Sequence, residues 1–382
     1  MKKKVCVLFP ALAFVFAFAG CSDDENSQNA VLTKGEPAKL SISIVGKTDG
    51  KVQSRADGNQ GTDESKVNDG IVYIFDGGGN VIKKVFLSTA DFSSNSATKA
   101  VTTTTAAQSL SVLLNVGITD STSLAGSRFD VPTRTQLEAL TAMLTDSSTG
   151  AAMQMKNNLV MSGTSGSIAF TGTPKTGSVS VTVSRIVSRV KVMWSFAPNS
   201  TYVNKVRLKG AVLLNVASAS KMFGNSLIPS SGVKYIQGLS QATFMGFPAT
   251  TFKPAAADVL FNETEFSVAS FAVPQVDENY FYVFENGPTF PTIVALVADY
   301  NENGLDVGAN MTKYYPVFIN RATSGGQDGM MDIIRNNQYM ISVTVKGIGV
   351  DNPYEPVDPA MLSVTISVAP WNLAINVNQT FE

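Results

Sequence analysis

The residues of this chain whose side chains could do chemistry are few. Histidine is absent, and the two thiols are Cys6 and Cys21. Without histidine there is no Ser-His-Asp or Cys-His nucleophile, no histidine general base and no histidine-containing zinc site. Cys21 follows three lysines and an apolar run, Val5–Gly20, which is shorter than the ~20 residues of a membrane-spanning helix. The pattern predicts a removable bacterial secretion signal over residues 1–20, and a cysteine at its end is suited to lipid attachment.

The residues on both sides of Cys21 indicate its modification. Ala19 and Gly20 resemble the lipobox of bacterial lipoproteins, whose cysteine receives lipid and becomes the new N-terminus. The acidic cluster Ser22–Asn26 resembles the surface-export tag of Bacteroidetes lipoproteins. The alternatives are ordinary secretion that leaves Cys21 as a spare thiol, and a plain solvated tether after it.

Composition narrows the class of protein further. Loss of Cys6 with the signal and lipidation of Cys21 would leave no thiol for a disulfide, so burial alone would stabilise the exported chain. The formal net charge is −1, and no basic stripe is visible, so nucleic-acid binding has no electrostatic basis. We expect neither a cofactor nor a metal, and the chain is long enough for two cores.

Short alternating segments dominate the rest of the chain. Ile71–Phe75 and Val81–Leu87 flank the turn sequence Asp76–Asn80, which predicts a β-hairpin. Ser178–Ser184 alternates strictly, as a strand does when one face is buried and the other is wet. Asp299–Gly304 has the oxygen spacing of the start of a calcium loop but lacks its final glutamate, and its Asn-Gly pair favours a turn.

One segment has a helical pattern. In Pro132–Leu144 the leucines at 137, 140 and 144 fall on one face, with Thr133 as a candidate N-cap and Gln136 as its capping-box partner. Many short strands with regular turns predict two tandem β-sandwiches, with one short helix in the first. We place the boundary near residue 222, giving domains at 56–222 and 223–382.

Several segments together carry a family resemblance. They are Asp69–Asp76, Ser184–Val190, Arg335–Tyr339 and Val364–Trp371, in addition to the signal. In their order and spacing the chain resembles the major fimbrial subunits of Bacteroidales, the FimA-type fimbrillin superfamily. The resemblance implies a mainly β protein with two transthyretin-like Greek-key sandwiches, which polymerises by exchanging strands after proteolysis.

The segment 21–55 is expected to be a tether and a removable strand. Its alternating strand buries one parity, formed by Leu40, Ile42 and Ile44, and a polar stretch with Lys51 and Arg55 follows. Exposed polar loops are where proteases cut, and the resemblance implies activation by an arginine-specific protease between Arg55 and Ala56. The alternative is an ordinary surface loop.

The C-terminal tail offers a donor strand. Leu373, Ile375, Val377 and Phe381 share one parity after Trp371. A sandwich that has lost a strand exposes an apolar groove and unpaired backbone groups, which another chain can fill. The alternative is that residues 372–382 form the last strand of their own domain, since a period-two pattern does not identify its partner.

These observations predict a structural protein and not an enzyme. We expect a fimbrial shaft subunit, made as an outer-membrane lipoprotein precursor, cut after Arg55 and assembled at the cell surface into a homopolymer that supports adhesion. Its partners would be identical or related subunits, the lipid anchor and the protease. The alternatives are a monomeric surface lipoprotein that binds a glycan or a host protein, and a fimbrial tip or anchor subunit.

Overall fold

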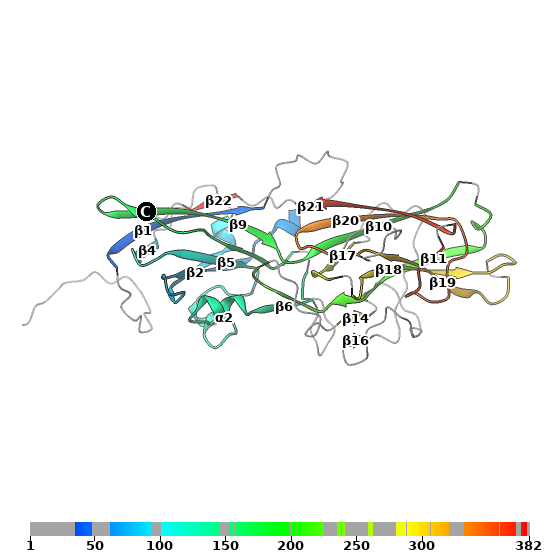
Figure 1. Ribbon diagram of the computed structural model, residues 1–382, viewed down its shortest axis with the longest axis horizontal. Helices are drawn as coiled ribbons and strands as arrows, with labels where there is room; N and C mark the ends of the chain where they lie inside the picture. Colours follow the sequence, from blue (N-terminus) through cyan, green and yellow to red (C-terminus); the bar gives the residue numbers. More distant parts are fainter. Residues whose placement is uncertain are drawn as a thin grey trace, which may run out of the picture. The chain divides into compact units, whose positions relative to one another are not determined.

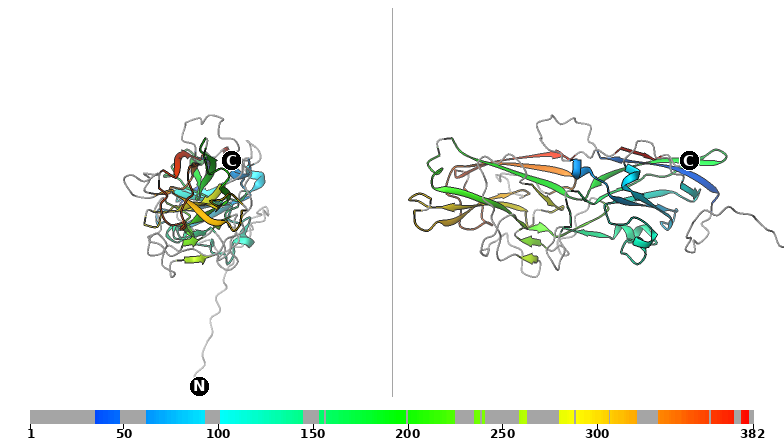
Figure 2. Two further views of the ribbon diagram at one scale, coloured as in Figure 1. Left: turned by 90° about the vertical axis from the view of Figure 1, so that its right-hand side faces the viewer. Right: turned by 180° about the vertical axis from the view of Figure 1, so that it is seen from behind.

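Alternating apolar and polar residues make this chain mainly β. The computed structural model describes residues 35–47, 62–92, 101–144, 153–155, 157–198, 200–224, 235–237, 239–240, 259–262, 280–287, 289–305, 307–320, 332–358, 360–371 and 376–379. All of them belong to one compact unit, Lys34–Glu382. Figure 1 labels the principal strands, and Figure 2 shows the same ribbon from two further sides.

A nine-stranded sheet forms from the first half of the chain and one strand from the C-terminus. Its strands, in chain order, are β1 (Pro37–Gly46), β2 (Asp69–Phe75), β3 (Val81–Ser88), β4 (Val101–Thr104), β5 (Ser109–Leu114), β7 (Met161–Thr164), β8 (Phe170–Thr171), β9 (Lys175–Arg185) and β22 (Asn376–Gln379). The order along the sheet is β22-β1-β9-β7-β5-β2-β3, with β4 also on β1 and β8 also on β9. The hairpin expected from Ile71–Leu87 is confirmed as β2 and β3.

The nine-stranded sheet folds into two layers, and the C-terminal end of β9 connects them. Its residues 175–183 pair with β1, and Ser184 and Arg185 pair with β7. One layer holds β1 and β9, the other β2, β5 and β7, and a buried apolar cluster fills the space between them. This arrangement is a β-sandwich, and the strict alternation predicted for Ser178–Ser184 is observed along β9.

The second half of the chain forms two four-stranded sheets. One has the order β17 (Tyr280–Val283), β10 (Ser188–Phe196), β20 (Asn337–Val345) and β21 (Leu362–Pro370). The other has the order β15 (Leu239–Ser240), β11 (Val206–Leu214), β18 (Ile293–Tyr300) and β19 (Met311–Phe318). Buried residues of both sheets, including Trp194, Leu296 and Ile341, belong to one core cluster. The fold is therefore a pair of β-sandwiches, as predicted.

Short elements complete the described fold. They are β6 (Thr141–Met143), β12 (Val216–Ala217), β13 (Ala219–Lys221), β14 (Tyr235–Gln237), β16 (Val259–Asn262), η1 (Thr62–Ser65), η2 (Thr89–Phe92), α1 (Ser121–Leu124) and α2 (Arg134–Glu138). No helix among the described residues is long and apolar enough to cross a membrane.

The helix expected over Pro132–Leu144 is shorter than predicted, and α1 precedes it as a second one. Thr133 does cap α2, its side chain accepting from the backbone N of Gln136 at 3.3 Å. The helix ends at Glu138 because Thr141–Met143 pairs as β6 with β13. Tertiary strand pairing thus overrides the leucine spacing in this segment.

Strand partners change between Arg185 and Ser188. β9 pairs with strands of the first half, whereas β10 pairs with β17 and β20 of the second half. The small β6–β13 sheet joins residues 141–143 to 219–221 across this point. The domain boundary near residue 222 stays a prediction.

Candidate functional site: strand β1 and the groove it fills

β1 is a core strand with one apolar face. Along Pro37–Gly46 the burial alternates, and Leu40, Ile42 and Ile44 are 0%, 1% and 2% exposed. They pack in the cluster that also holds Val181 and Val183 of β9. Complete burial of three such side chains contributes about 1.5–3 kcal/mol each, or about 5–9 kcal/mol together, before ordering costs. The parity predicted from the sequence is the buried one.

Both edges of β1 are occupied. On one side it runs parallel to β9 in an unbroken register from Ala38 opposite Lys175 to Gly46 opposite Val183. On the other side two strands share the edge: β4 lies opposite residues 37–40 and β22 opposite residues 42–45, both antiparallel. Removing β1 would therefore leave unpaired the edges that β9, β4 and β22 turn towards it, with an apolar floor between them. Such a groove is a template for another strand.

β22 comes from the tail that the sequence predicts as a donor. Its pairing places Val377 opposite Ile44 and Gln379 opposite Ile42. In Figure 1 the red β22 lies alongside the blue β1, next to the green β9. The tail therefore joins the sheet of the first sandwich, whereas the last strand of the second sandwich is β21. The other predicted donor residues, Leu373, Ile375 and Phe381, lie outside the described residues.

The predicted modification and cleavage sites also lie outside the described residues. Cys21 precedes the first of them, and Lys51, Arg55 and Ala56 fall between Lys47 and Thr62. The structure does describe both flanks of the cleavage segment. On its N-terminal side is β1, and on its C-terminal side is η1, whose Glu64 is 1% exposed.

Glu64 belongs to a buried polar cluster that the sequence analysis missed, which we call the root cluster: Glu64, Ser65, Arg185, Arg189, Tyr282, Gln338 and Trp371. Glu64 Oε2 accepts from Arg189 Nη1 at 2.8 Å, and its Oε1 accepts from Tyr282 Oη at 2.8 Å. Arg185 is 1% exposed and Trp371 is 0% exposed. Burial lowers the pKa of Arg185 to about 10, so the guanidinium keeps its charge at neutral pH.

One sequence signal could have located Arg185. It shares the parity of Val181 and Val183 on the strictly alternating strand β9, so a cation stands where a buried side chain is required. A buried charge needs a partner, which means that such a residue predicts a buried ion pair or hydrogen-bond network. Its partners are more than a hundred residues away along the sequence, so the pattern could not name them.

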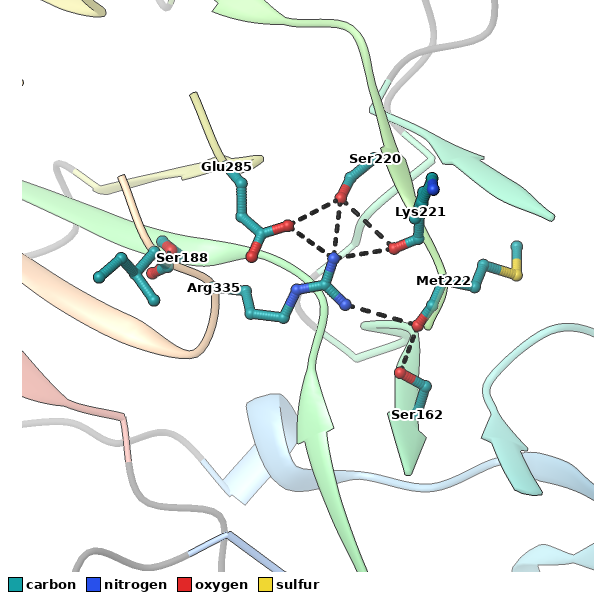
Figure 3. A network of polar contacts seen from close by, with 8 residues as sticks. Ser162, Ser188, Ser220, Lys221, Met222, Glu285 and Arg335 are labelled. Atoms are coloured by element: carbon teal, nitrogen blue, oxygen red, sulfur yellow. Dashed lines mark hydrogen bonds and ion pairs between the residues drawn. The ribbon is translucent and has the colours of Figure 1, made fainter. Parts of the chain in front are cut away.

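A second buried ion pair joins β13 to the second half of the chain. Arg335 Nη2 donates to Glu285 Oε2 at 2.6 Å, to Ser220 Oγ at 3.1 Å and to the carbonyl of Lys221 at 2.9 Å. Figure 3 shows the guanidinium at the centre of these contacts, with Met222 on its other side. This network fixes the segment after β11 against the strands around Arg335.

The calcium-like sequence is the loop of a hairpin. β18 and β19 pair from Ile293 opposite Phe318 to Tyr300 opposite Met311, which agrees with the turn predicted from the Asn-Gly pair. Asp299 makes ion pairs with Arg207 at 3.1 Å and Lys209 at 3.3 Å. The described residues contain no group of three acidic, histidine or cysteine side chains that could hold a metal ion.

The fold of the chain is similar to that of solved bacterial proteins. A putative cell adhesion protein from Bacteroides eggerthii is 24% identical, with a TM-score of 0.68 over 90% of this chain and 98% of the other. A fimbrilin from Porphyromonas gingivalis W83 is 22% identical, with a TM-score of 0.60 over 90% of this chain and 99% of the other. At these identities the likeness concerns the fold.

Sequence comparison identifies the family. The model of the major fimbrial subunit protein FimA matches residues 38–207, and that of the FimA4 pilin C-terminal domain matches residues 187–371. The major fimbrium subunit FimA type-4 of Porphyromonas gingivalis is 30% identical over 64% of this chain and 70% of its own length. The chain belongs to the FimA family of major fimbrial subunits. It is a structural protein of a cell-surface fimbria and not an enzyme.

Proposed function

We propose that this chain is the precursor of a fimbrial shaft subunit, activated by removal of β1 and polymerised by strand exchange. Cys21 carries lipid and holds the precursor in the outer membrane. An arginine-specific protease cuts between Arg55 and Ala56, and the released segment takes β1 with it. Identical or related subunits then join in a fimbria that supports adhesion.

The observation that carries this proposal is the position of β1 in both sequence and sheet. β1 is the first described strand along the chain, yet it lies inside the sheet with both edges paired. One cut between β1 and η1 therefore detaches a complete core strand without breaking another described strand. The residues that remain keep β9 as one wall of an open groove.

The same cut frees the donor. β22 is paired with β1 over residues 376–379, so loss of β1 removes its strand partner. In the proposal, the tail with Leu373, Ile375, Val377 and Phe381 then replaces Leu40, Ile42 and Ile44 in the groove of the next subunit. Backbone hydrogen bonds along β9 would supply affinity, and the apolar floor would fix which parity faces inward.

The direct test treats the purified precursor with an arginine-specific protease. We expect a new N-terminus at Ala56 and ladders on an unboiled SDS gel. Arg55→Ala should abolish both, whereas the matched variant Lys51→Ala in the same segment should change neither. Cleavage at Ala56 without ladders would refute strand exchange and favour a monomeric surface lipoprotein.

Two further variants separate the donor and the anchor. Deletion of 373–382 should leave a folded precursor that is cut normally but forms no ladders; normal ladders would place the donor elsewhere. Cys21→Ser should abolish incorporation of labelled palmitate and release the precursor from the membrane fraction. Unchanged incorporation would refute Cys21 as the lipidated residue.

A further inference from the structure

Trp371 is the last described residue before the tail, and it is fixed at both of its backbone groups. Its N–H donates to the carbonyl of Asn336 at 2.8 Å, and its carbonyl accepts from Arg185 Nη1 at 3.1 Å. Its ring is fully buried and lies parallel to that of Tyr282, with centroids 5.9 Å apart at 8°. The root of the tail is therefore held by contacts that do not involve β1.

Arg185 connects this root to the wall of the groove. It is the last residue of β9, the strand that pairs with β1 throughout Ala38–Gly46. Its guanidinium lies 4.1 Å from the centroid of the Trp371 ring, which is the geometry of a cation–π contact. One side chain thus links the strand that would receive a donor to the segment from which this chain's own tail departs.

The segment after the predicted cleavage site fixes Arg185 in turn. Arg185 Nε donates to the carbonyl of Glu64 at 3.1 Å, and Nη2 donates to Ser65 Oγ at 3.1 Å. The Glu64 carboxylate is itself fixed by Arg189 and Tyr282. A planar guanidinium with three separate acceptors holds its orientation in a way that a lysine ammonium does not.

We propose that Arg185, oriented by Glu64 and Ser65, is a positioning residue that holds Trp371 as the fixed root of the C-terminal strand. The C-terminal strand would then change its partner while β21 and the root cluster stay folded. In a filament, tension on one donor strand passes along β9 and through Arg185 to the next donor strand. The part of this inference that concerns the filament rests on the proposed strand exchange, whereas the fixed position of Trp371 does not.

The first experiment measures the solvent exposure of Trp371. Trp194→Phe leaves Trp371 as the sole tryptophan of the full chain. We expect its fluorescence to be equally shielded from acrylamide in the precursor, in the cleaved subunit and in the ladders. A rise in quenching towards the value of the urea-unfolded chain, at cleavage or in the ladders, would overturn the fixed root. This readout does not require ladders, so it remains decisive if strand exchange itself fails.

The second experiment tests the role of Arg185 in the filament. Arg185→Lys keeps the positive charge but cannot donate to all three acceptors in the same geometry. We expect normal cleavage, and ladders that dissociate about tenfold faster in SDS. Arg207→Lys is the matched control, since Arg207 is paired with Asp299 away from the root cluster. Equal dissociation of the Arg185→Lys and wild-type ladders would overturn the proposal.

A milder variant tests the same proposal if Arg185→Lys is defective in folding. If Arg185→Lys does not fold, Ser65→Ala removes one acceptor of Arg185 from η1 and should speed ladder dissociation in the same direction. Urea unfolding of each precursor separates a general loss of stability from an effect on the filament joint. Faster dissociation only in proportion to precursor stability would show a merely structural role. Absence of ladders in the wild type would refute the strand exchange and not the fixed root.

Discussion

Replacing Ile42 with alanine should destabilise the precursor and leave the filament unchanged. Ile42 is 1% exposed, in the middle of β1, and packs in the cluster between the two layers of the first sandwich. Truncation of a buried isoleucine to alanine costs about 2–5 kcal/mol, because the contacts are lost and a cavity remains. That is a large part of the ~5–15 kcal/mol that stabilises an ordinary domain.

In the proposed assembly the filament should be unaffected, because the proposed cut removes Ile42. If Arg55 is the cleavage site, the variant and wild-type subunits have the same sequence from Ala56 onward. The cut strand should also leave its groove faster in the variant: about 3 kcal/mol corresponds to a dissociation rate about a hundredfold higher. Ladders should therefore form sooner in the variant, wherever release of β1 limits the rate.

Two measurements check this prediction. Urea unfolding of the precursors should show a midpoint about 1 M lower for Ile42→Ala, taking a loss of about 3 kcal/mol and a slope of about 3 kcal/mol/M. Heating the ladders in SDS should then give the same dissociation temperature for both. Lys39→Ala, on the exposed face of the same strand, should behave as wild type in both assays. Variant ladders that are less stable than wild-type ladders would mean that β1 stays in the filament, which would refute its removal.

Three further predictions concern the rest of the fold. Glu285→Gln should lower the free energy of unfolding by about 3–5 kcal/mol, because it leaves Arg335 buried without its counter-charge, and a midpoint unchanged in urea would contradict this. Thr133→Ala should cost about 1 kcal/mol through loss of the α2 cap, measured by thermal unfolding against the exposed neighbour Thr135→Ala. Burial raises the pKa of Tyr314 to about 12, so the folded state favours the neutral phenol. The contribution of Tyr314 to the free energy of unfolding should therefore be constant below pH 10 and should fall as the pH rises from 10 towards 12. Tyr314→Phe should reduce that alkaline loss, and an identical pH profile would contradict it.

The local sequence pattern was sufficient to predict which face of strands β1 and β9 is buried. The alternation in Leu40–Ile44 and in Ser178–Ser184 predicted which parity would be inside, because side chains in a strand point to opposite faces in turn. The turn between β2 and β3 could also be predicted from its glycines, because glycine adopts positive φ angles without strain. In the structure Gly79 has a φ of 78°. These features depend on neighbours in sequence, which is why they could be predicted.

Features that depend on distant partners could not be read in the same way. The leucines of Pro132–Leu144 have helical spacing, but Leu144 N donates to the carbonyl of Ser218, so strand pairing with a remote segment decides the end of α2. The root cluster includes residues of η1, β9 and β17 together with Trp371. In the sequence, only the position of Arg185 on the buried face of β9 indicates that such a cluster exists. A pattern states that a partner is needed and does not state which residue supplies it.

The position of β22 illustrates this limit and gives it a functional meaning. The parity of the tail fits any apolar groove, and in the precursor it is paired with β1 over four residues, whereas β9 is paired with β1 over nine. In the proposed exchange, a tail that enters a vacated groove gains the longer register and the apolar floor that Leu40, Ile42 and Ile44 occupied. The short pairing in the precursor is therefore the weaker of the two arrangements for the tail. In the proposed mechanism β1 would prevent the exchange by occupying the groove, and its removal would make the stronger arrangement accessible.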